Sequence, residues 1–583
     1  MYDFYIFEDI TKTFYMNKYF FVLTTAMILS GCGPGNNKRS SDVIKDQGNI
    51  AKNGMVVSDH PKGSGIGVEI LKKGGNAIDG AIATEFALAV CYPEAGNIGG
   101  GGFMVIRTSD GKVDAIDFRE KAPADASRDM YLDKSGNVNE GLSTNTRMAS
   151  GVPGTVDGLL TAYAKYGKLP FKEIIQPAID LAANGFPVTK EQAQSLNSNR
   201  KTFVERNPGH TAFVKDSLWK EGDILKQPEL AETLIRIKDF GRDGFYSGRT
   251  ADLIISEMKK GKGIITPNDL KSYKSVWREP LIGYYRGYKI ITICPPSSGG
   301  VTLLQLLKMT ENYSLNEMGF HSLREIHLIT EEERRAFADR AEFLGDPDYV
   351  HIPVKKLLDP EYLRDRMKTF NVKKASLSSD IFHGFPEAYQ SEQTTHYSVV
   401  DSMGNAVSTT TTLNNTFGNS IVVAGAGFLL NNQMDDFSVK PGFPNMYGLV
   451  GGEANSIQPG KRMLSSMTPT IIEKDGKLFL VVGSPGGSTI ATTVFQIIIN
   501  ILDFGMNVQD AVNAGRFHHQ WLPDYISYER KSIDSSTLKQ LELLGHTLKV
   551  RNSIGLVNAI QILPDGKKAG GADKRGYNVA SGY

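Results

Sequence analysis

The stretch that most constrains this chain is a threonine-rich segment that begins directly after a polar loop. Glycine, proline and polar residues dominate positions 384–393, and an alternation of apolar and polar residues follows from Tyr397 onward. Residues 402–405 stand where a hairpin turn is needed, and Val407 with the threonines after it resumes the alternation. We therefore expect two antiparallel strands, with Thr394 at the start of the first.

The position of Thr394 allows two interpretations. If the bond between Gln393 and Thr394 is cut, the threonine gains a free α-amine that can act as the base for its own hydroxyl, which makes it a good nucleophile. The alternative is an ordinary threonine-rich hairpin without chemistry. The spacing alone favours neither interpretation, so the rest of the chain has to decide between them.

The composition excludes some classes of protein. The chain has 583 residues, of which 40% are apolar, and this is enough for a large core or several domains. Its formal net charge is +1, and it has no acidic or basic tail. A near-neutral chain offers no electrostatic attraction for nucleic acid, so we expect no nucleic-acid partner.

The first residues indicate export. Lys18 precedes an apolar run over 19–29, which is too short to span a bilayer and is typical of a signal-peptide core. The small residues Ser30 and Gly31 stand directly before Cys32, and this order is similar to the bacterial lipoprotein signal, in which the cysteine receives a lipid. The alternative is a plain secretory signal that is cut elsewhere.

We therefore expect a signal peptide over 1–32 that ends at a lipidated Cys32. The protein would be exported to the periplasm or the cell surface, with the lipid as its only contact with the membrane. Residues 1–15 carry acidic side chains, which do not fit a basic n-region, so Met16 suits the start of such a signal better than Met1.

The other cysteines and a histidine pair predict no metal and no cofactor. Cys91 ends an apolar helical run and Cys294 precedes a proline, which fits neither a disulfide framework nor metal-ligand spacing, so we expect both to pack in the core. His518 and His519 have no carboxylate at ligand spacing. We expect them to be structural, or at most to line a site.

Periodicity predicts many helices and two further hairpins. Two helices are expected over 63–92, separated by Gly74 and Gly75, with Asn76 as the cap of the second. The charged run 331–335 is interpreted as a solvated helix face. Other helices are predicted at 156–166, 171–183, 229–238, 254–259, 303–309 and 323–343, hairpins at 103–118 and 470–482, and a strand at 421–430.

Polar or glycine-rich segments follow the predicted strands of the second half. Residues 431–436 come directly after an apolar strand, which is a usual place for a binding site. Residues 440–452 are rich in Pro and Gly around Tyr447 and predict an exposed loop or lid. Gly486 and Gly487 join a strand to an apolar helix expected over Ser488 to Leu502, so their N–H groups could hold a negative charge. The alternative is a tight connection without chemistry.

Several separate stretches together resemble one family, the bacterial γ-glutamyltranspeptidases, which belong to the N-terminal nucleophile hydrolases. The matching stretches are TTHYSV at 394–399, GNAV at 404–407, TTTLN at 410–414, FG at 417–418, LLNNQMDDF at 429–437, LSSM at 464–467, GSPGG at 483–487, GGGGF at 99–103 and DFRE at 117–120. The resemblance covers nearly everything from about Gly54 to Tyr583. An ordered set of this kind is highly specific, and it removes the plain-hairpin interpretation of Thr394.

The resemblance implies an α+β fold, a four-layer αββα sandwich made as one precursor. The precursor would cut itself between Gln393 and Thr394 into a large subunit, 33–393, and a small catalytic subunit, 394–583, which stay together as a heterodimer. The same Thr394 hydroxyl would then attack the γ-glutamyl amide of glutathione and related compounds. The glutamyl group would pass to water or to an amino acid or peptide.

The resemblance also implies the roles of the site residues. Catalysis would fall to Thr394 as nucleophile, Thr412 as its orienting partner, and Gly486 and Gly487 as the oxyanion donors. The substrate's α-carboxylate would meet Arg119, Ser465 and Ser466, its α-ammonium would meet Asn414, Gln433 and Asp436, and Tyr447 would belong to a lid over the pocket. No metal and no cofactor is implied.

Two other functions compete with this one. A related acylase of the cephalosporin or poly-γ-glutamate type could use the same fold, but a ligand without an α-amino acid head does not need the clamp of Arg119, Ser465 and Ser466. An inactive surface lipoprotein with a binding role is the second competitor. The presence of Thr394, Thr412 and the glycine pair at 486–487 argues against it.

Overall fold

The computed structural model describes residues 48–209, 211–381 and 394–583. The expected signal peptide over 1–32, with Met16 and Cys32, lies outside these residues, and so does Gln393. The part of the chain from 46 onward forms one compact unit. In the described residues, no helix combines the length and the apolar composition needed to cross a bilayer.

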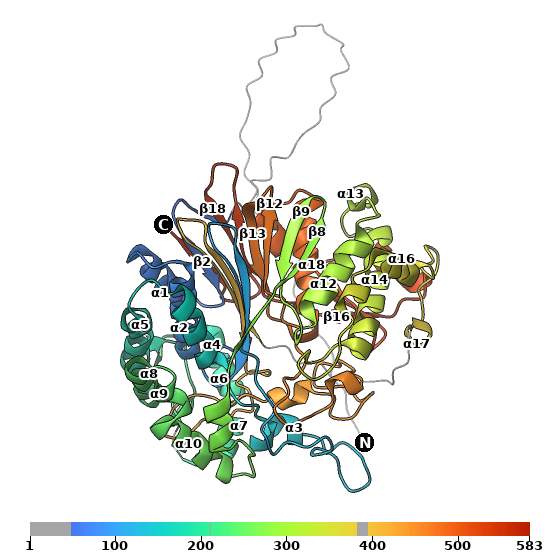
Figure 1. Ribbon diagram of the computed structural model, residues 1–583. Helices are drawn as coiled ribbons and strands as arrows, with labels where there is room; N and C mark the ends of the chain where they lie inside the picture. The colour runs from blue at the N-terminus through green and yellow to red at the C-terminus, as the bar shows by residue number, and fades with distance from the viewer. Residues whose placement is uncertain (1–47, 210, 382–393) are drawn as a thin grey trace, which may run out of the picture. The chain divides into compact units, whose positions relative to one another are not determined.

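Two seven-stranded antiparallel sheets form the centre of the molecule (Figure 1). The first sheet runs in the order β19 (Val579–Gly582), β2 (Met55–Ser58), β10 (Thr395–Val400), β11 (Ala406–Thr412), β3 (Gly101–Arg107), β4 (Val113–Asp117) and β7 (Val276–Arg278). The second runs in the order β1 (Asn49–Ala51), β18 (Lys568–Ala572), β17 (Asn558–Ile562), β13 (Lys477–Gly483), β12 (Thr470–Lys474), β9 (Tyr288–Thr292) and β8 (Leu281–Tyr285). Strands from both ends of the chain therefore alternate within each sheet.

The two sheets pack face to face through apolar side chains. Val57 and Val105 of the first sheet share a buried cluster with Val481 and Ile560 of the second. Alternate residues of each strand point to opposite faces, so the other face of each sheet is left to the helices. Both faces of the central strands are buried, and every residue of β3, β10 and β11 lies inside the protein.

One layer of helices covers the outer face of the first sheet. Helices α1 (Pro61–Lys72) and α2 (Ala77–Cys91) lie on the strands, and Asn76 caps α2 in a reciprocal capping box with Asp79. The helices outside them are α4 (Thr155–Tyr166), α5 (Phe171–Asn184), α6 (Lys190–Ser198), α7 (Arg200–Arg206), α8 (Pro228–Phe240), α9 (Asp243–Tyr246), α10 (Gly248–Lys259) and α11 (Pro267–Ser272). The cap and the helix pair predicted for residues 63–92 are confirmed.

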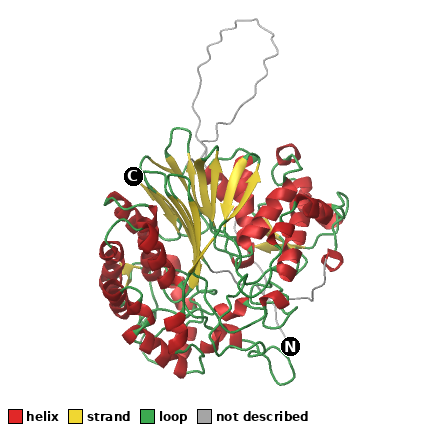
Figure 2. Cartoon of the chain, in the orientation of Figure 1, coloured by secondary structure: helices red, strands yellow, loops and turns green. Residues whose placement is uncertain are grey.

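A second helical layer covers the outer face of the other sheet, which completes the αββα order (Figure 2). It consists of α12 (Gly299–Thr310), α13 (Leu315–Met318), α14 (Leu323–Phe343), α15 (Val354–Leu357), α16 (Pro360–Met367), α17 (Ser378–Ile381), α18 (Ile490–Leu502), α19 (Val508–Asn513) and α20 (Ser535–Leu543). The four-layer α+β sandwich expected from the sequence is confirmed.

Short elements occupy the loops between these layers. They are α3 (Leu142–Asn145), the 3₁₀ turns η1 (Arg147–Ala149), η2 (Gln433–Asp436), η3 (Glu453–Asn455) and η4 (Gly487–Thr489), the pair β5 (Phe186–Pro187) and β6 (Ile224–Leu225), and the small sheet of β14 (Phe517–His518), β15 (Ile526–Glu529) and β16 (Leu548–Arg551). Cys91 and Cys294 are free and buried, as predicted.

Two sequence predictions of secondary structure are wrong. Residues 421–430 form turns joined by a single bridge between Val422 and Leu429, because Gly425 and Gly427 both adopt positive φ and break the extended run. The helix after the glycine turn begins at Ile490, after the 3₁₀ turn η4, and not at Ser488.

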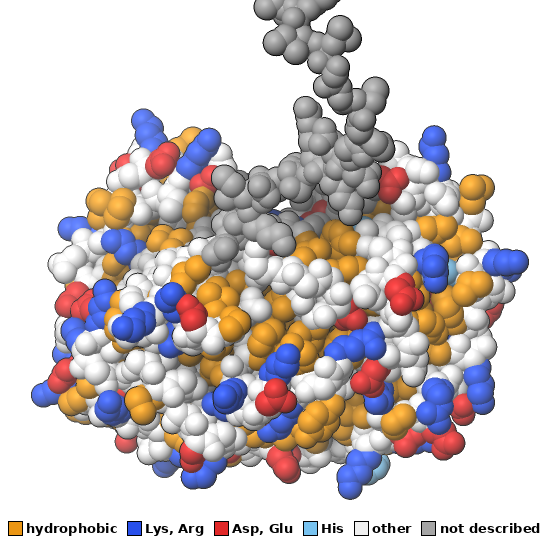
Figure 3. Space-filling view, turned by 90° about the horizontal axis from the view of Figure 1, so that it is seen from above, with side chains coloured by type: hydrophobic (Ala, Val, Ile, Leu, Met, Phe, Trp, Pro, Cys, Tyr) orange, Lys and Arg blue, Asp and Glu red, His pale blue; other side chains and the backbone are white. Residues whose placement is uncertain are grey.

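The surface matches the near-neutral composition of the chain. Figure 3 shows Lys and Arg side chains interspersed with Asp and Glu over the face that it draws, with hydrophobic side chains between them. Charges of both signs are mixed there, without a single-sign field on that face.

Candidate active site

The hairpin of β10 and β11 brings two threonines together at its open end. Thr395 pairs with Thr411, so the residues beyond them, Thr394 and Thr412, face each other. Their hydroxyl oxygens lie 3.5 Å apart, and both side chains are buried. This distance is longer than that of a strong hydrogen bond between hydroxyls, as is common before a site engages its substrate.

Two buried carboxylates hold the ends of these strands. Asp59, just before α1, accepts the Thr395 hydroxyl at 2.7 Å, and Glu85 of α2 accepts the Thr411 hydroxyl at 3.0 Å. Burial raises the pKa of each carboxyl to about 7. No local sequence pattern predicts either contact, because each joins residues more than 300 positions apart.

Arg119 lies at the end of β4 with its guanidinium group buried. It donates to the carbonyl oxygens of Met463 at 3.3 Å and Leu464 at 3.2 Å, and it forms an ion pair with Asp436. The Glu120 carboxylate lies 3.5 Å away. The planar fork of arginine suits the two oxygens of a carboxylate, so Arg119 has the chemistry of a carboxylate receptor that is occupied by a protein acid in this state.

Ser465 and Ser466 follow the segment that holds Arg119. The Ser465 N–H donates to Pro296 O at 2.9 Å, and its carbonyl accepts from Ser298 N–H at 2.8 Å, so the loop before α12 fixes this segment. The Ser466 hydroxyl accepts from Arg340 of α14 at 3.4 Å. Both serines line the same cavity as Arg119.

The 3₁₀ turn η2 supplies acceptors on the opposite side. Gln433 donates through Nε2 to Asp436 at 2.7 Å, while its Oε1 is buried with no hydrogen-bond partner in the described structure. Asn414 adopts positive φ and donates to Asn432 O at 3.0 Å. A carboxylate and an unpartnered amide oxygen at a cavity wall are suited to an ammonium group.

Gly486 and Gly487 connect β13 to η4, both with positive φ. Gly487 lines the cavity that contains Thr394. A Cβ atom on Gly487 would lie 2.6 Å from the ring of Tyr447, so this position has to be glycine for that ring to pack. The predicted strand–glycine turn therefore stands beside the predicted nucleophile.

Residues 440–452, here called the lid, close over the cavity. The Tyr447 hydroxyl donates to Asn414 O, and Gln520 Nε2 donates to Tyr447 O at 3.1 Å. Tyr447 is buried in a cluster with Phe337 and Trp521. The expectation of an exposed loop is therefore wrong for Tyr447. Its ring packs against apolar side chains that are distant in the sequence, so the local pattern did not indicate this contact.

One small cavity collects these side chains from distant segments. It is lined by Arg119, Arg340, Thr394, Thr412, Asn414, Gln433, Asp436, Tyr447, Leu449, Leu464, Ser465, Ser466, Met467, Gly487 and Ile490. With the lid closed its volume is about 20 Å³, which is room for about one water molecule. A larger molecule can enter only after the lid or the Arg119–Asp436 pair moves.

Arg340 is the charged residue of this cavity that the sequence prediction missed. It is buried, and burial lowers the pKa of its guanidinium group to about 10, so it stays charged at neutral pH. The interpretation of 331–335 as a solvated face is wrong as well, because all five residues are buried. Five consecutive charges surround a helix completely, so some of them had to face inward on a packed helix.

Among the described residues, one group of side chains has a geometry that could hold a metal ion: His327, Glu331 and His546. Their contacts argue against it. The two rings bond to each other at 2.7 Å, and Glu331 already pairs with Arg334 and Arg335, whose charges would repel a cation. His518 and His519 bond to Gln520 and Asp524, and neither histidine is among the residues lining the cavity, in line with a structural role.

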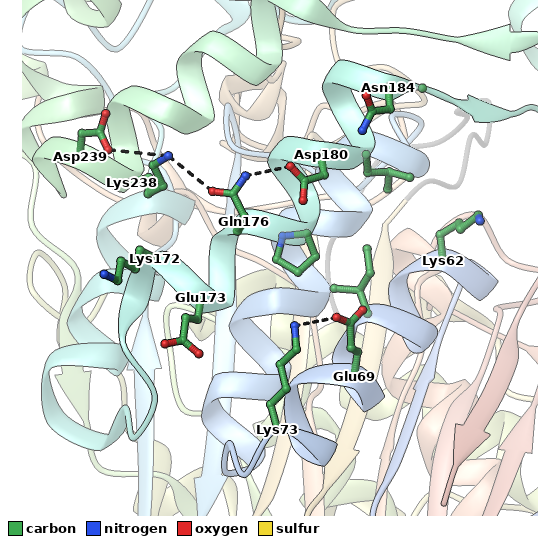
Figure 4. A pocket seen from close by; sticks show the side chains of 14 residues that line it. Lys62, Glu69, Lys73, Lys172, Glu173, Gln176, Asp180, Asn184, Lys238 and Asp239 are labelled. Carbon is green, nitrogen blue, oxygen red and sulfur yellow. Dashed lines mark hydrogen bonds and ion pairs between the residues drawn. The ribbon is translucent and has the colours of Figure 1, made fainter.

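A larger hollow lies on the outer helices, far in sequence from the hairpin. Its volume is about 920 Å³, and Figure 4 shows its charged side chains pairing with one another, such as Lys73 with Glu69. Gln176 bridges Lys238 and Asp180 in the same way. No threonine, serine or glycine pair stands among its lining residues, so the chemistry belongs to the small cavity.

A threonine that opens a central strand of an αββα sandwich, beside a glycine turn, defines an N-terminal nucleophile hydrolase. The comparisons with known proteins agree with this class. A family model described as gamma-glutamyltranspeptidase matches residues 63–583. The chain belongs to the γ-glutamyltranspeptidase family.

Individual relatives support the same assignment. The chain is 48% identical to the glutathione hydrolase proenzyme of Escherichia coli (strain K12), over 91% of this chain and 92% of that one. It is 47% identical to the enzyme of the same name from Pseudomonas aeruginosa, over 90% and 94%. A solved γ-glutamyltranspeptidase chain from Helicobacter pylori is 46% identical, with a TM-score of 0.55, and covers 56% of this chain and 94% of its own.

Acylases share the fold and part of the sequence. The cephalosporin acylase from Bacillus halodurans superposes with a TM-score of 0.81 over 96% of this chain and 99% of its own, at 26% identity. A Pseudomonas protein (strain SE83) named acylase ACY 1 proenzyme is 36% identical, over 89% of this chain and 91% of its own. The chain is a γ-glutamyl transferase and hydrolase of the N-terminal nucleophile type.

Proposed function

We propose that this enzyme cuts its own chain before Thr394 and then transfers the γ-glutamyl group of glutathione and related amides through a threonine ester. The observation that carries the proposal is that Thr394, Arg119, Asp436 and Gly487 line one cavity although they come from four distant segments. The two E. coli and Pseudomonas aeruginosa relatives named glutathione hydrolase support glutathione as a substrate.

The proposed chemistry uses one hydroxyl twice. In the precursor the Thr394 oxygen attacks the carbonyl carbon of Gln393, and the C–N bond breaks, which frees the Thr394 amine and leaves an ester on the oxygen. Water then hydrolyses this ester to the Gln393 carboxylate and the free Thr394 hydroxyl. That amine then takes the hydroxyl proton while the oxygen attacks the γ-carbonyl of the donor. The donor's amine leaves, and water or an acceptor amine cleaves the glutamyl ester.

The glycine turn supplies the oxyanion donors in this proposal. The N–H groups of Gly486 and Gly487 stand at a strand-to-helix turn, where backbone dipoles favour negative charge. Loss of one such donor typically raises a barrier by roughly 3 kcal/mol. Thr412 orients the Thr394 hydroxyl from across the hairpin.

The donor is selected by exchange of an ion pair. Arg119 pairs with Asp436 in the structure. A glutamyl donor carries both an α-carboxylate and an α-ammonium, so it can take each partner at once: Arg119, Ser465 and Ser466 receive the carboxylate, while Asn414, Gln433 and Asp436 receive the ammonium. Only the side-chain carbonyl then reaches Thr394, which favours the γ-amide over the α-amide.

A cephalosporin-type acylase activity is the alternative, because a cephalosporin acylase and an acylase proenzyme are among the similar proteins. The Arg119–Asp436 pair argues for the γ-glutamyl donor. An acyl group without an α-amino acid head has no carboxylate for Arg119 and no ammonium for Asp436. Separating this buried ion pair would then leave both charges without a partner, which is costly.

The test of this function uses the chain without residues 1–32. A denaturing gel is expected to show two fragments, of about 360 and about 190 residues by the proposed boundary, and the purified protein is expected to release p-nitroaniline from γ-glutamyl-p-nitroanilide. The matched control is the isomer α-glutamyl-p-nitroanilide. It has the same composition, but its amide is on the α-carbonyl and not on the γ-carbonyl. An uncut chain without activity, or equal rates on the two isomers, would contradict the proposal.

Lipid attachment is a separate proposal, supported by the sequence around Cys32. The full chain is expected to sediment with membranes, and Cys32→Ser is expected to leave the protein in the soluble fraction or as an uncleaved precursor. Fractionation followed by the γ-glutamyl-p-nitroanilide assay checks it. Membrane-bound activity from the Cys32→Ser variant that carries no lipid would contradict it.

A further inference from the structure

Asn445 joins the lid to the acidic side of the donor cavity. Its Oδ1 accepts the N–H groups of Tyr447 at 2.9 Å and Leu449 at 3.1 Å, which closes the tight turn of the lid. Its Nδ2 donates to Asp436 Oδ1 at 3.1 Å. A single side chain therefore shapes the turn that carries Tyr447 and reaches the carboxylate of the cavity.

The other contacts of Asp436 lie on its second oxygen. Oδ2 receives Arg119 and the Gln433 amide, which is 2.7 Å away. When a ligand's ammonium displaces Arg119 from Oδ2, the Asn445 bond to Oδ1 can persist. The Asp436 carboxylate would then keep its orientation while the ammonium replaces Arg119, and the lid would stay hydrogen-bonded to it through Asn445.

We propose that Asn445 is a positioning residue for the γ-glutamyl donor, which aims the Asp436 carboxylate at the donor's ammonium and couples that contact to closure of the lid. The inference rests on the proposed function, in which Asp436 receives the ammonium. Coupling of this kind is reciprocal: the closed lid strengthens donor binding, and the bound donor strengthens closure.

Two substitutions separate this role from a role in shaping the turn alone. Asn445→Asp keeps the Oδ1 acceptor that holds Tyr447 and Leu449, but it replaces the donor facing Asp436 with a second carboxylate oxygen. Asn445→Ser keeps a short acceptor for the turn and adds no charge, but it cannot reach Asp436. A residue that only shaped the lid would tolerate the aspartate.

The aspartate variant is expected to change the pH dependence of donor binding. Charged groups around Asp436 are Arg119, Arg340, Glu120 and Asp435. A new carboxylate about 3 Å from Asp436 raises the apparent pKa of the pair, because two like charges so close resist full ionisation. The donor's ammonium needs the ionised carboxylate of Asp436. As the pH falls, the Asn445→Asp variant is expected to lose this ionised form at a higher pH than the parent enzyme does.

The experiment measures kcat and KM for γ-glutamyl-p-nitroanilide from pH 5 to 9, with both variants processed into subunits as proof of folding. Asn445→Ser is expected to raise KM about tenfold, the factor for a hydrogen bond to a charged group, with kcat changed less than about threefold. Asn445→Asp is expected to move the acidic limb of kcat/KM upward by about one pH unit. Asn316→Asp, an exposed amide on α13, is the matched charge control and is expected to behave as the parent.

The outcomes distinguish this inference from the proposed function. A parent-like KM in Asn445→Ser, or a parent-like pH profile in Asn445→Asp, would overturn the role of Asn445. Asp436→Ala is measured alongside. If it leaves KM unchanged, Asp436 does not receive the ammonium and the donor clamp of the proposed function fails; if it raises KM while the Asn445 variants do not, only the inference about Asn445 fails.

Discussion

Replacing Thr394 with alanine is expected to leave a single uncut chain that releases no p-nitroaniline from γ-glutamyl-p-nitroanilide. Both losses follow from one missing atom, because the Thr394 oxygen attacks the chain's own peptide bond and then the donor. Neighbouring hydroxyls cannot substitute for it. Thr395 is bonded to Asp59, and Thr412, although 3.5 Å away, has no α-amine of its own to release.

A control for this variant removes a buried threonine hydroxyl elsewhere. The Thr330 hydroxyl on α14 has no hydrogen-bond partner in the described structure, so Thr330→Val removes an oxygen without breaking a bond. It is expected to be cut and active. Two subunits from Thr394→Ala, seen on a denaturing gel, would mean that the nucleophile lies at another position.

Arg119→Ala is expected to raise the donor KM by about a hundredfold or more while self-cleavage continues. Removing one partner of a buried ion pair costs roughly 3–5 kcal/mol, which corresponds to about two to three and a half powers of ten in an equilibrium constant. The donor's α-carboxylate also loses its receptor, whereas attack on the Gln393–Thr394 bond does not need one. Steady-state kinetics and a gel check both parts.

The control for Arg119 is another buried ion pair, which joins β3 of the first sheet to β12 of the second. Arg107 bonds to Glu473 at 2.6 Å, with both side chains buried, so Arg107→Ala should lose comparable stability. It is expected to keep the parent KM. Unchanged donor KM in Arg119→Ala, or an equal rise in Arg107→Ala, would remove Arg119 from the donor site and leave it a structural cation.

The sequence predicted those parts of the fold that depend on neighbours along the chain. The hairpin around 402–405 and the Asn76 cap of α2 follow from turn chemistry and periodicity within a few residues. The strand expected at 421–430 failed because an apolar run fits a packed loop as well as a strand. Gly425 and Gly427 decided the outcome there.

The site, like the fold, was predicted in part from the sequence, and the contacts between distant segments were not. The resemblance supplied many of the residues that line the cavity, including Arg119 and Asp436, but no local pattern indicated that these two pair with each other. Asp59, Glu85 and Arg340 were missed, since each reaches the hairpin or the cavity from a distant segment. Their burial is visible only after the sheets and helices have packed.

The alternation of strands from the two parts of the chain has a consequence for the mature enzyme. A cut before Thr394 puts β10 to β19 in one fragment and β1 to β9 in the other, yet β2 lies between β19 and β10, and β12 pairs with β9. Neither fragment then owns a complete sheet, so they can separate only by unfolding. After denaturation the halves must find each other in solution, so recovery of the cut enzyme is expected to fall on dilution, whereas refolding of the uncut chain is not a two-body event.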